Sequence, residues 1–163
     1  MIDLQSVTSE SHLREAFGCF PSGVTAVCAL VDGVPRGMAA SSFTSVSLSP
    51  ALVSICIQRT SSTWPLLRNR PRLGLSVLAE GQDDACLSLS ARHGDRFREV
   101  EWEPGPDDSV FISGSSAWLE CSLHDEVPAG DHVIALLKIH RLRAAGIPPL
   151  VFHGSRFRRL AAV

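Results

Sequence analysis

Short apolar runs separated by turn residues make up most of the chain. Residues 24–31 indicate a buried strand, Asp32-Gly33 is a hairpin turn signal, and the return strand is expected over 36–43. Residues 51–58, rich in valine and isoleucine, and residues 73–79 have the same strand character. The first half of the chain therefore predicts strands joined by tight turns.

The second half continues this pattern after a turn-rich loop at 95–115. Apolar and polar side chains alternate over 117–124 with the period of two that is typical of a half-buried strand. A turn at 128–130 and a partner strand over 131–144 complete a long hairpin, and a small hairpin follows at 149–160. Many strands, few helices and no strand–helix–strand alternation predict a closed or nearly closed antiparallel barrel.

Three short segments have helical character. Residues 12–20 suit an amphipathic helix, and residues 82–92 a helix with acidic residues near its positive end. Residues 61–69 predict a third helix, capped by Ser61 or Ser62. The apolar side chains that share one face of the first segment are Leu13, Ala16, Phe17 and Phe20.

Length and composition indicate one ordinary globular domain over residues 1–163, with 45% hydrophobic and 20% charged residues. A formal net charge of -2 gives no electrostatic reason to expect nucleic acid or an anionic membrane as a partner. The uncharged stretch 37–58 is long enough to span a bilayer, but its six serines and Pro50 argue against a membrane helix. The first residues lack the basic and apolar regions of a secretory signal.

The common motifs of metal, nucleotide and hydrolase sites are missing. The five cysteines are scattered without a C-x-x-C pair, so we interpret them as small buried hydrophobes in a reducing cytoplasm. No Cys/His cluster has metal-ligand spacing, and we expect no metal site. The GCFPSG segment has the glycine spacing of a phosphate loop but lacks its lysine, and no G-x-S-x-G elbow is present.

The order and spacing of several segments resemble one known family. The chain is similar to the short-chain flavin reductases, the reductase halves of two-component flavin-dependent monooxygenases, over nearly all of its length. The resemblance implies a mainly β fold, a split Greek-key β-barrel with a few short helices, which dimerises and binds flavin beside the barrel near the subunit interface. The segments that carry it are FGCFPSGVTAVCA (17–29), GMAASSFTSVSLSPALVSICIQRTSSTWP (37–65), HGDRF (93–97), AWLEC (117–121), GDHVIALLKI (130–139) and PLVFHGSRFRRL (149–160).

If the chain binds a flavin, as the resemblance implies, the uncharged stretch 37–58 suits the flavin ring. An isoalloxazine is flat, uncharged when oxidised and edged with hydrogen-bonding groups, so it needs close backbone approach and modest donors. We expect Gly37, Ala39 and Ala40 to let the main chain come near, and Ser41 and Ser42 to offer hydroxyls and amides to the pyrimidine edge. On composition alone, a half-buried strand with a polar outer face would be the simpler interpretation.

The resemblance also implies contacts with the ribityl chain and the phosphate. Ser47 and the turn over residues 58–63 are similar to the family's contacts there. In that turn Arg59 supplies a cation, and Ser62 and Thr63 supply hydroxyls at a helix start, which is a favourable place for an anion.

Five further residues are assigned by the resemblance. Arg96 and Phe97 match the family's RF pair, near the phosphate or adenylate end. His132 matches a histidine close to the nicotinamide, where it could orient the pyridine ring or donate a hydrogen bond to it. His153 and Arg156, in the terminal turn, are expected to contact NADH phosphate or ribose.

The expected activity is NAD(P)H:flavin oxidoreduction, in which hydride passes from NADH to FAD or FMN and the reduced flavin supplies a separate oxygenase. NADH is favoured over NADPH because no clear basic cluster lies outside the terminal arginines. A non-catalytic flavin- or haem-binding split-barrel module and a direct flavoprotein oxygenase remain alternatives. Departures from the family pattern at 40–42 and at Ala51 leave FAD or FMN open.

Overall fold

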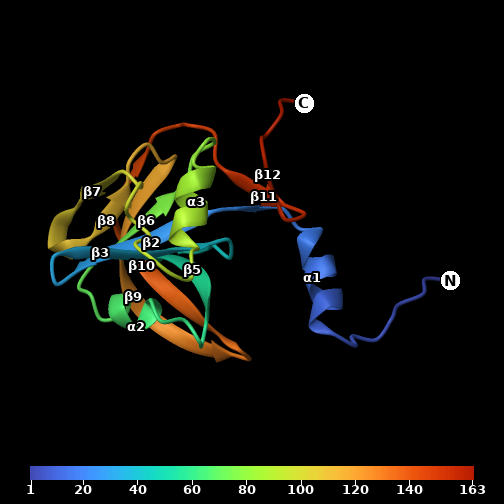
Figure 1. Ribbon diagram of the computed structural model, residues 1–163. Coiled ribbons are helices and arrows are strands. Elements are labelled where there is room, and N and C mark those ends of the chain that lie inside the picture. The colour runs from blue at the N-terminus through green and yellow to red at the C-terminus, as the bar shows by residue number, and fades with distance from the viewer.

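The computed structural model describes residues 1–163, and strands dominate it (Figure 1). The helices are α1 (Glu10–Gly18), α2 (Trp64–Leu67) and α3 (Asp83–Leu89), with one 3-10 turn, η1 (Pro106–Asp108). The strands are β1 (Ser22–Gly23), β2 (Thr25–Val31), β3 (Val34–Ala40), β4 (Thr44–Leu48), β5 (Ala51–Gln58), β6 (Leu73–Val77), β7 (Trp102–Pro104), β8 (Val110–Ile112), β9 (Ala117–Ala129), β10 (His132–Ala144), β11 (Val151–His153) and β12 (Arg156–Arg158).

Seven strands form one antiparallel sheet in the order β3-β2-β6-β9-β10-β5-β4. The long β9–β10 hairpin lies at its centre, while β3 and β4 are its edges (Figure 1). A three-stranded sheet, β1-β11-β12, and the β7–β8 hairpin complete the fold. The prediction of a mainly β, split-barrel fold is confirmed.

Strand β2 is buried on both faces, which explains its continuous apolar sequence. Val27 and Ala29 belong to the cluster that fills the barrel interior. Ala26 and Cys28 point the other way, into a second cluster with Leu89 of α3. Strand β2 thus separates the two clusters, and α3 packs on the neighbouring strand β3, where it borders the cavity described below.

The predicted hairpin at Asp32-Gly33 and the predicted strand over 51–58 are confirmed. The predicted strand over 51–58 coincides with β5, Ala51–Gln58. Asp32 and Gly33 adopt positive φ angles of 52° and 76°, as a tight two-residue turn between β2 and β3 requires.

The prediction of a turn-rich loop over 95–115 is wrong in part, because the segment holds the β7–β8 hairpin and η1. Strand β8 was missed because it is three residues long and fully buried, which leaves no alternation to detect. It packs so closely on β6 that a Cβ on Gly74 would lie 2.0 Å from the Val110 carbonyl oxygen.

The predicted amphipathic helix is α1, whose apolar face is not covered within this chain. The Ser9 hydroxyl caps it by accepting a hydrogen bond from the His12 backbone amide. No residue of α1 is buried, and the side chains of Phe17 and Phe20 are 68% and 77% exposed. The helix stands away from the barrel in Figure 1.

The interpretation of the cysteines as buried hydrophobes is right for some and wrong for others. All five are free thiols. Cys28 and Cys121 are buried, and burial raises the pKa of the Cys121 thiol to about 12. Cys19 and Cys56 are exposed, so the apolar runs around them do not enclose them. No helix combines the length and apolar character that a bilayer crossing requires.

Candidate functional site

A cavity of about 770 Å³ opens at the split in the barrel. Its walls come from the end of β3, the end of β5, the turn that leads into α2, and the last residues of α3. Strand β3 is an edge strand with no ladder to β5, and the cavity lies where that ladder is missing. Its volume is within the range of about 300–1,000 Å³ typical of small-molecule sites.

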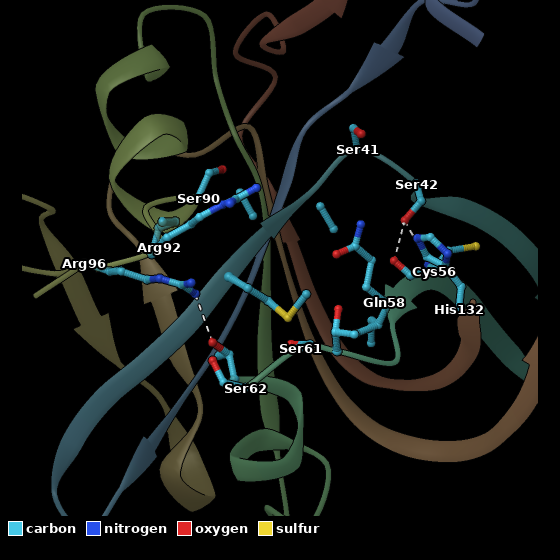
Figure 2. Close-up of a pocket in the computed structure, with 17 residues that line it drawn as sticks. Ser41, Ser42, Cys56, Gln58, Ser61, Ser62, Ser90, Arg92, Arg96 and His132 are labelled. Carbon is cyan, nitrogen blue, oxygen red and sulfur yellow. Dashed lines mark hydrogen bonds between the residues drawn. The ribbon is translucent and has the colours of Figure 1, made fainter. Parts of the chain in front are cut away.

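The two sides of the cavity differ in charge. Figure 2 shows Arg92 and Arg96 on one side, while Ser42, Cys56 and His132 lie on the other. No aspartate or glutamate lines the cavity. We refer to the side with Arg92 and Arg96 as the cationic end and to the side with Ser42, Cys56 and His132 as the neutral end.

The Ser42 hydroxyl holds the neutral end together. It accepts a hydrogen bond from the Cys56 backbone amide at 2.8 Å and donates to the Cys56 carbonyl at 3.2 Å (Figure 2). One side chain thus links the segment after β3 to β5 where no backbone ladder does. This contact occupies the hydroxyl that the sequence assigned to the ligand, while Ser41 makes no side-chain hydrogen bond within the chain.

Arg96 is fixed at the cationic end by neutral acceptors alone. Its guanidinium donates to the carbonyl oxygens of Ala91 at 2.7 Å and Gly37 at 2.9 Å, and to the Thr63 hydroxyl at 3.0 Å. Phe97, next along the chain, is buried in the second core cluster and anchors this loop. Because these acceptors carry no formal charge, the positive charge of Arg96 stays uncompensated within the protein.

His132 is oriented by its neighbour. Its Nδ1 lies 2.7 Å from an Asp131 carboxylate oxygen, and the histidine side chain is 35% exposed. The hydrogen bond with His132, followed by the attraction of its charge, holds the pKa of Asp131 below its usual range. His132 faces Gln58 across the β10–β5 ladder, and the Arg59 amide donates to the Asp131 carbonyl. The carboxylate therefore fixes the ring at the mouth of the cavity.

The structure brings together most of the residues that the sequence assigned to a flavin. Those that line the cavity are Ala39, Ala40, Ser41, Ser42, Gln58, Ser62, Thr63, Arg96 and His132. Those that do not line it are Gly37, Ser47, Arg59, Phe97, His153 and Arg156.

Gly37 has a different reason to be glycine than the one expected. A Cβ there would lie 2.4 Å from the Cys28 sulfur and 3.0 Å from the Val27 carbonyl oxygen. The small residue therefore lets β3 pack on β2. The Gly37 carbonyl contributes by accepting from Arg96.

The expected anion site at a helix start needs correction. Helix α2 has only four residues, Trp64–Leu67, so few peptide dipoles align behind Ser62 and Thr63. The Ser61 hydroxyl, rather than that of Ser62, accepts from the Trp64 amide. The positive charge at this end therefore comes from arginine side chains.

Four predicted residues lie elsewhere. Ser47 sits beside an irregularity on edge strand β4, and Arg59 is exposed after β5. His153 and Arg156 face each other across the terminal β11–β12 hairpin. The Gly154 amide ties that hairpin to the Gly18 carbonyl at the end of α1, so these two residues lie beside α1 (Figure 1).

Sequence reasoning missed part of the cavity wall. The missed residues are Met38, Cys56, Ile57, Leu89, Ser90 and Arg92, whereas Thr60 and Ser61 lie in the predicted 58–63 turn. Arg92 directly precedes the HGDRF segment, so its position beside Arg96 was available as a signal. Leu89 and Ser90 reach the cavity only because α3 packs on β3, a tertiary contact with no local pattern.

The comparisons with known proteins all indicate the same family. The family model of the flavin reductase like domain matches residues 17–161. The NADH-dependent FAD reductase of Streptomyces globisporus is 41% identical over 157 residues, which cover 92% of this chain and 85% of that protein. The solved NADH:FAD oxidoreductase of Streptomyces globisporus, in complex with NAD and FAD fragments, superposes with a TM-score of 0.91 at 38% identity and covers 98% of both chains.

Other relatives are longer than this chain. The stachydrine N-demethylase reductase subunit of Rhizobium meliloti is 36% identical over 136 residues, which are 83% of this chain but 59% of that protein. The reductase component of the flavin-dependent trigonelline monooxygenase of Acinetobacter baylyi is matched over 50% of its length. The chain thus spans about half the length of these two relatives.

Proposed function

The chain belongs to the flavin reductase like domain family, and from this premise we propose that it is an NAD(P)H-dependent flavin reductase. In this proposal it transfers hydride from NADH to FAD or FMN and supplies the reduced flavin to a separate oxygenase. The observation that carries the proposal is the cavity at the barrel split, which has no carboxylate, a neutral end and a cationic end.

The residues of the cavity fit a flavin phosphate. The neutral end offers small side chains at Ala39 and Ala40 and the free hydroxyl of Ser41, which suit the edge of an uncharged ring. The cationic end offers Arg92 and the fixed Arg96, which suit an ester phosphate. Gln58 and the 60–63 turn lie between the two ends and would hold the ribityl chain.

His132 is the proposed catalytic residue. It lines the neutral end, and its Nδ1–H donates to the Asp131 carboxylate, which leaves the Nε2 of the neutral ring to accept a hydrogen bond from the nicotinamide carboxamide. A bound flavin would supply the hydride acceptor for the reduced nicotinamide, and this chemistry needs no protein base. The task left to the chain is to hold the two rings against each other.

The residues outside the cavity have more distant roles in the proposal. His153 and Arg156 are candidates for contact with phosphate or ribose of the nicotinamide dinucleotide, and Ser47 and Arg59 for contact with the outer part of the flavin. Phe97 acts by anchoring Arg96. We propose further that residues 1–163 work as one domain.

We also propose that the protein is a cytoplasmic homodimer. Apolar side chains that this chain leaves uncovered support a dimer: Phe17 on α1, Phe20 just after α1, and Leu48, which is 98% exposed, on edge strand β4. Five free cysteines support a reducing compartment. Light scattering of the purified protein distinguishes dimer from monomer.

The test of the activity is oxidation of NADH by the purified protein with added FMN or FAD under air. The proposal expects steady NADH consumption that depends on flavin, with NADH preferred over NADPH. Measurable flavin binding without NADH oxidation would contradict the enzyme and favour a non-catalytic flavin-binding module. Oxygenation of an organic substrate by the isolated protein would favour a direct oxygenase.

A further inference from the structure

Glu126 on β9 is a glutamate that the fold turns towards the barrel interior. Leu123, three residues before it, packs against the interior cluster, so an unbroken strand would point Glu126 outwards. The β9–β10 register shifts by one residue between Leu136 and Leu137. After this bulge Glu126 pairs with the buried Ala135, and directly opposite residues of two strands share one face of the sheet. The bulge therefore aims Glu126 inwards.

Both carboxylate oxygens of Glu126 bind helix α2. The indole Nε1 of Trp64 donates to Oε1 at 2.5 Å, and the guanidinium of Arg68 donates to Oε2 at 2.5 Å. The side chain of Glu126 is only 16% exposed, and Trp64 belongs to the interior cluster. A carboxylate in this position is costly without hydrogen-bond donors, and α2 supplies both of them.

Helix α2 directly continues the 60–63 turn, which lines the cavity. Trp64 follows Thr63 in the chain, and its backbone amide donates to the Ser61 hydroxyl at 3.2 Å. The Thr63 hydroxyl in turn accepts the hydrogen bond from Arg96 at 3.0 Å. A series of contacts therefore runs from Glu126 through Trp64 and Thr63 to the cationic end of the cavity.

The start of this turn is fixed by other contacts. The Arg59 amide donates to the Asp131 carbonyl, and the Ser61 amide donates to the Gln58 carbonyl. His132 is held by its place opposite Gln58 in the β10–β5 ladder. The neutral end thus has its own backbone supports, and the second half of the turn depends on α2.

We propose that Glu126 is a positioning residue, which holds Trp64 and so keeps Thr63 against Arg96 where the flavin phosphate binds. This inference rests on the proposed function, which places that phosphate at the cationic end. Glu126 does not line the cavity, so it acts through α2. Its two oxygens have separate tasks. Oε1 orients Trp64 and with it the cavity wall, while Oε2 pairs with Arg68, which is 46% exposed, and contributes stability.

The test measures FMN affinity by titration of flavin fluorescence, without nicotinamide. Glu126→Ala is expected to weaken FMN binding about fivefold, the value of one hydrogen bond. Glu126→Gln keeps an oxygen for the Trp64 indole and should retain the FMN affinity, although it loses the ion pair with Arg68. Trp64→Phe removes the donor and should match Glu126→Ala, and the double variant should bind no more weakly than either single variant. Glu80→Ala is the matched control, because it breaks the Glu80–Arg159 ion pair away from the cavity.

Two further measurements separate positioning from catalysis and from stability. In NADH oxidation, Glu126→Ala should raise the KM for FMN about fivefold and leave kcat within about twofold, because His132 has its own backbone supports. Crystal structures of the wild type and of Glu126→Ala, both without flavin, give a readout that does not depend on turnover. The Thr63 hydroxyl is expected to lose its hydrogen bond from Arg96 in the variant.

Three results would overturn the proposal. The first is an unchanged FMN affinity in Glu126→Ala. The second is an equal loss in Glu126→Gln and Glu126→Ala, which would assign the effect to the ion pair with Arg68. The third is an intact hydrogen bond between Thr63 and Arg96 in the crystal structure of Glu126→Ala. Failure of the wild-type protein to oxidise NADH with FMN would instead overturn the proposed function, and the crystal structures would still decide the role of Glu126.

Discussion

Two groups of arginines in this protein have opposite surroundings. On the outer wall of the barrel, Arg72 and Arg141 bind Glu120, whose side chain is 4% exposed, with the closest nitrogen–oxygen distances 3.1 Å and 2.5 Å. At the cationic end of the cavity, Arg92 and Arg96 have no carboxylate partner in the chain. The first group carries its own counter-ion, and the second does not.

The comparison shows how to separate structural arginines from binding ones. Glu120 is a direct carboxylate partner for both Arg72 and Arg141, so both of these arginines are paired within the chain. Arg96 is held as firmly, by three hydrogen bonds, but all its acceptors are neutral. Neutral acceptors fix the position of a guanidinium without cancelling its charge, which leaves a preorganised site for an anion.

Loss of Arg96 should have the largest effect on binding. Arg96→Ala removes the charge at the cationic end, and we expect affinity for FMN and FAD to fall about a hundredfold, which corresponds to about 3 kcal/mol for charge-assisted hydrogen bonds. Riboflavin, which has no phosphate, should lose much less. Isothermal titration with FMN and riboflavin checks this. Arg98→Ala is the control, because Arg98 is an exposed arginine that does not line the cavity. An equal loss for both flavins would mean that Arg96 only supports the cavity wall.

Loss of Glu120 should affect stability and leave binding unchanged. Glu120→Gln is expected to lower the free energy of unfolding by about 2 kcal/mol, below the usual cost of breaking a buried ion pair, because Arg141 is 63% exposed and can be hydrated. Urea denaturation measures this effect. A changed FMN affinity in the variant would contradict the separation between the two groups.

The same variant has a defined pH dependence. The hydrogen bond from Arg141, together with the charges of Arg141 and Arg72, lowers the pKa of Glu120. A lowered pKa contributes stability above the ordinary carboxylate value of about 4.3, and this is lost as the pH falls through the lowered value. The stability difference between wild type and Glu120→Gln should therefore be constant from about pH 5 to pH 8 and shrink below about pH 4. A difference that persists unchanged in acid would refute this role.

Replacement of His132 tests the neutral end. His132→Ala should reduce kcat/KM for NADH about tenfold, the value of one hydrogen bond to the nicotinamide, while the flavin Kd changes by less than about twofold. His124→Ala is the control, because His124 is an exposed histidine on β9 that does not reach the cavity. Steady-state kinetics with varied NADH gives the result. If kcat/KM is unchanged, His132 does not contact the nicotinamide.

A higher salt concentration should have the smallest effect on flavin affinity, and this effect should distinguish the two ends of the cavity. Raising sodium chloride from about 50 mM to about 500 mM is expected to weaken FMN binding about threefold, because the cationic end is partly open to solvent. Riboflavin binding should not respond, since its contacts are with the neutral end. Fluorescence titration at several salt concentrations checks this, and a similar response for both flavins would count against the division of the cavity.

The sequence predicted the elements whose patterns are local. Strand β5 alternates and is rich in valine and isoleucine, and the turn at Asp32-Gly33 follows from turn chemistry. Strand β8 was missed because its side chains are all buried, and β4 because its small polar residues resemble a loop. These two strands depend on contacts with β7 and β5 that the local sequence does not encode.

The residues of the candidate site also divide into those that the sequence predicted and those that depend on tertiary packing. The resemblance located Ser41, Gln58 and His132, which lie in or beside the strands that carry its motifs. It did not find Ser90, which reaches the cavity through the packing of α3. It gave Ser42 and Gly37 ligand roles, which stay predictions, and the structure adds the hydrogen bond of Ser42 to Cys56 and the packing of Gly37 on β2. Composition cannot separate these cases, because small and hydroxylated residues serve both purposes.

The central claim is that the cavity at the barrel split binds a flavin with its ring at the neutral end and its phosphate at Arg96. A crystal structure of the protein with FAD tests it most directly. The account predicts the ring beside Ser41 and His132 and a phosphate within hydrogen-bonding distance of Arg96. FAD bound at another place, or bound in the reverse orientation with its ring against the arginines, would contradict it.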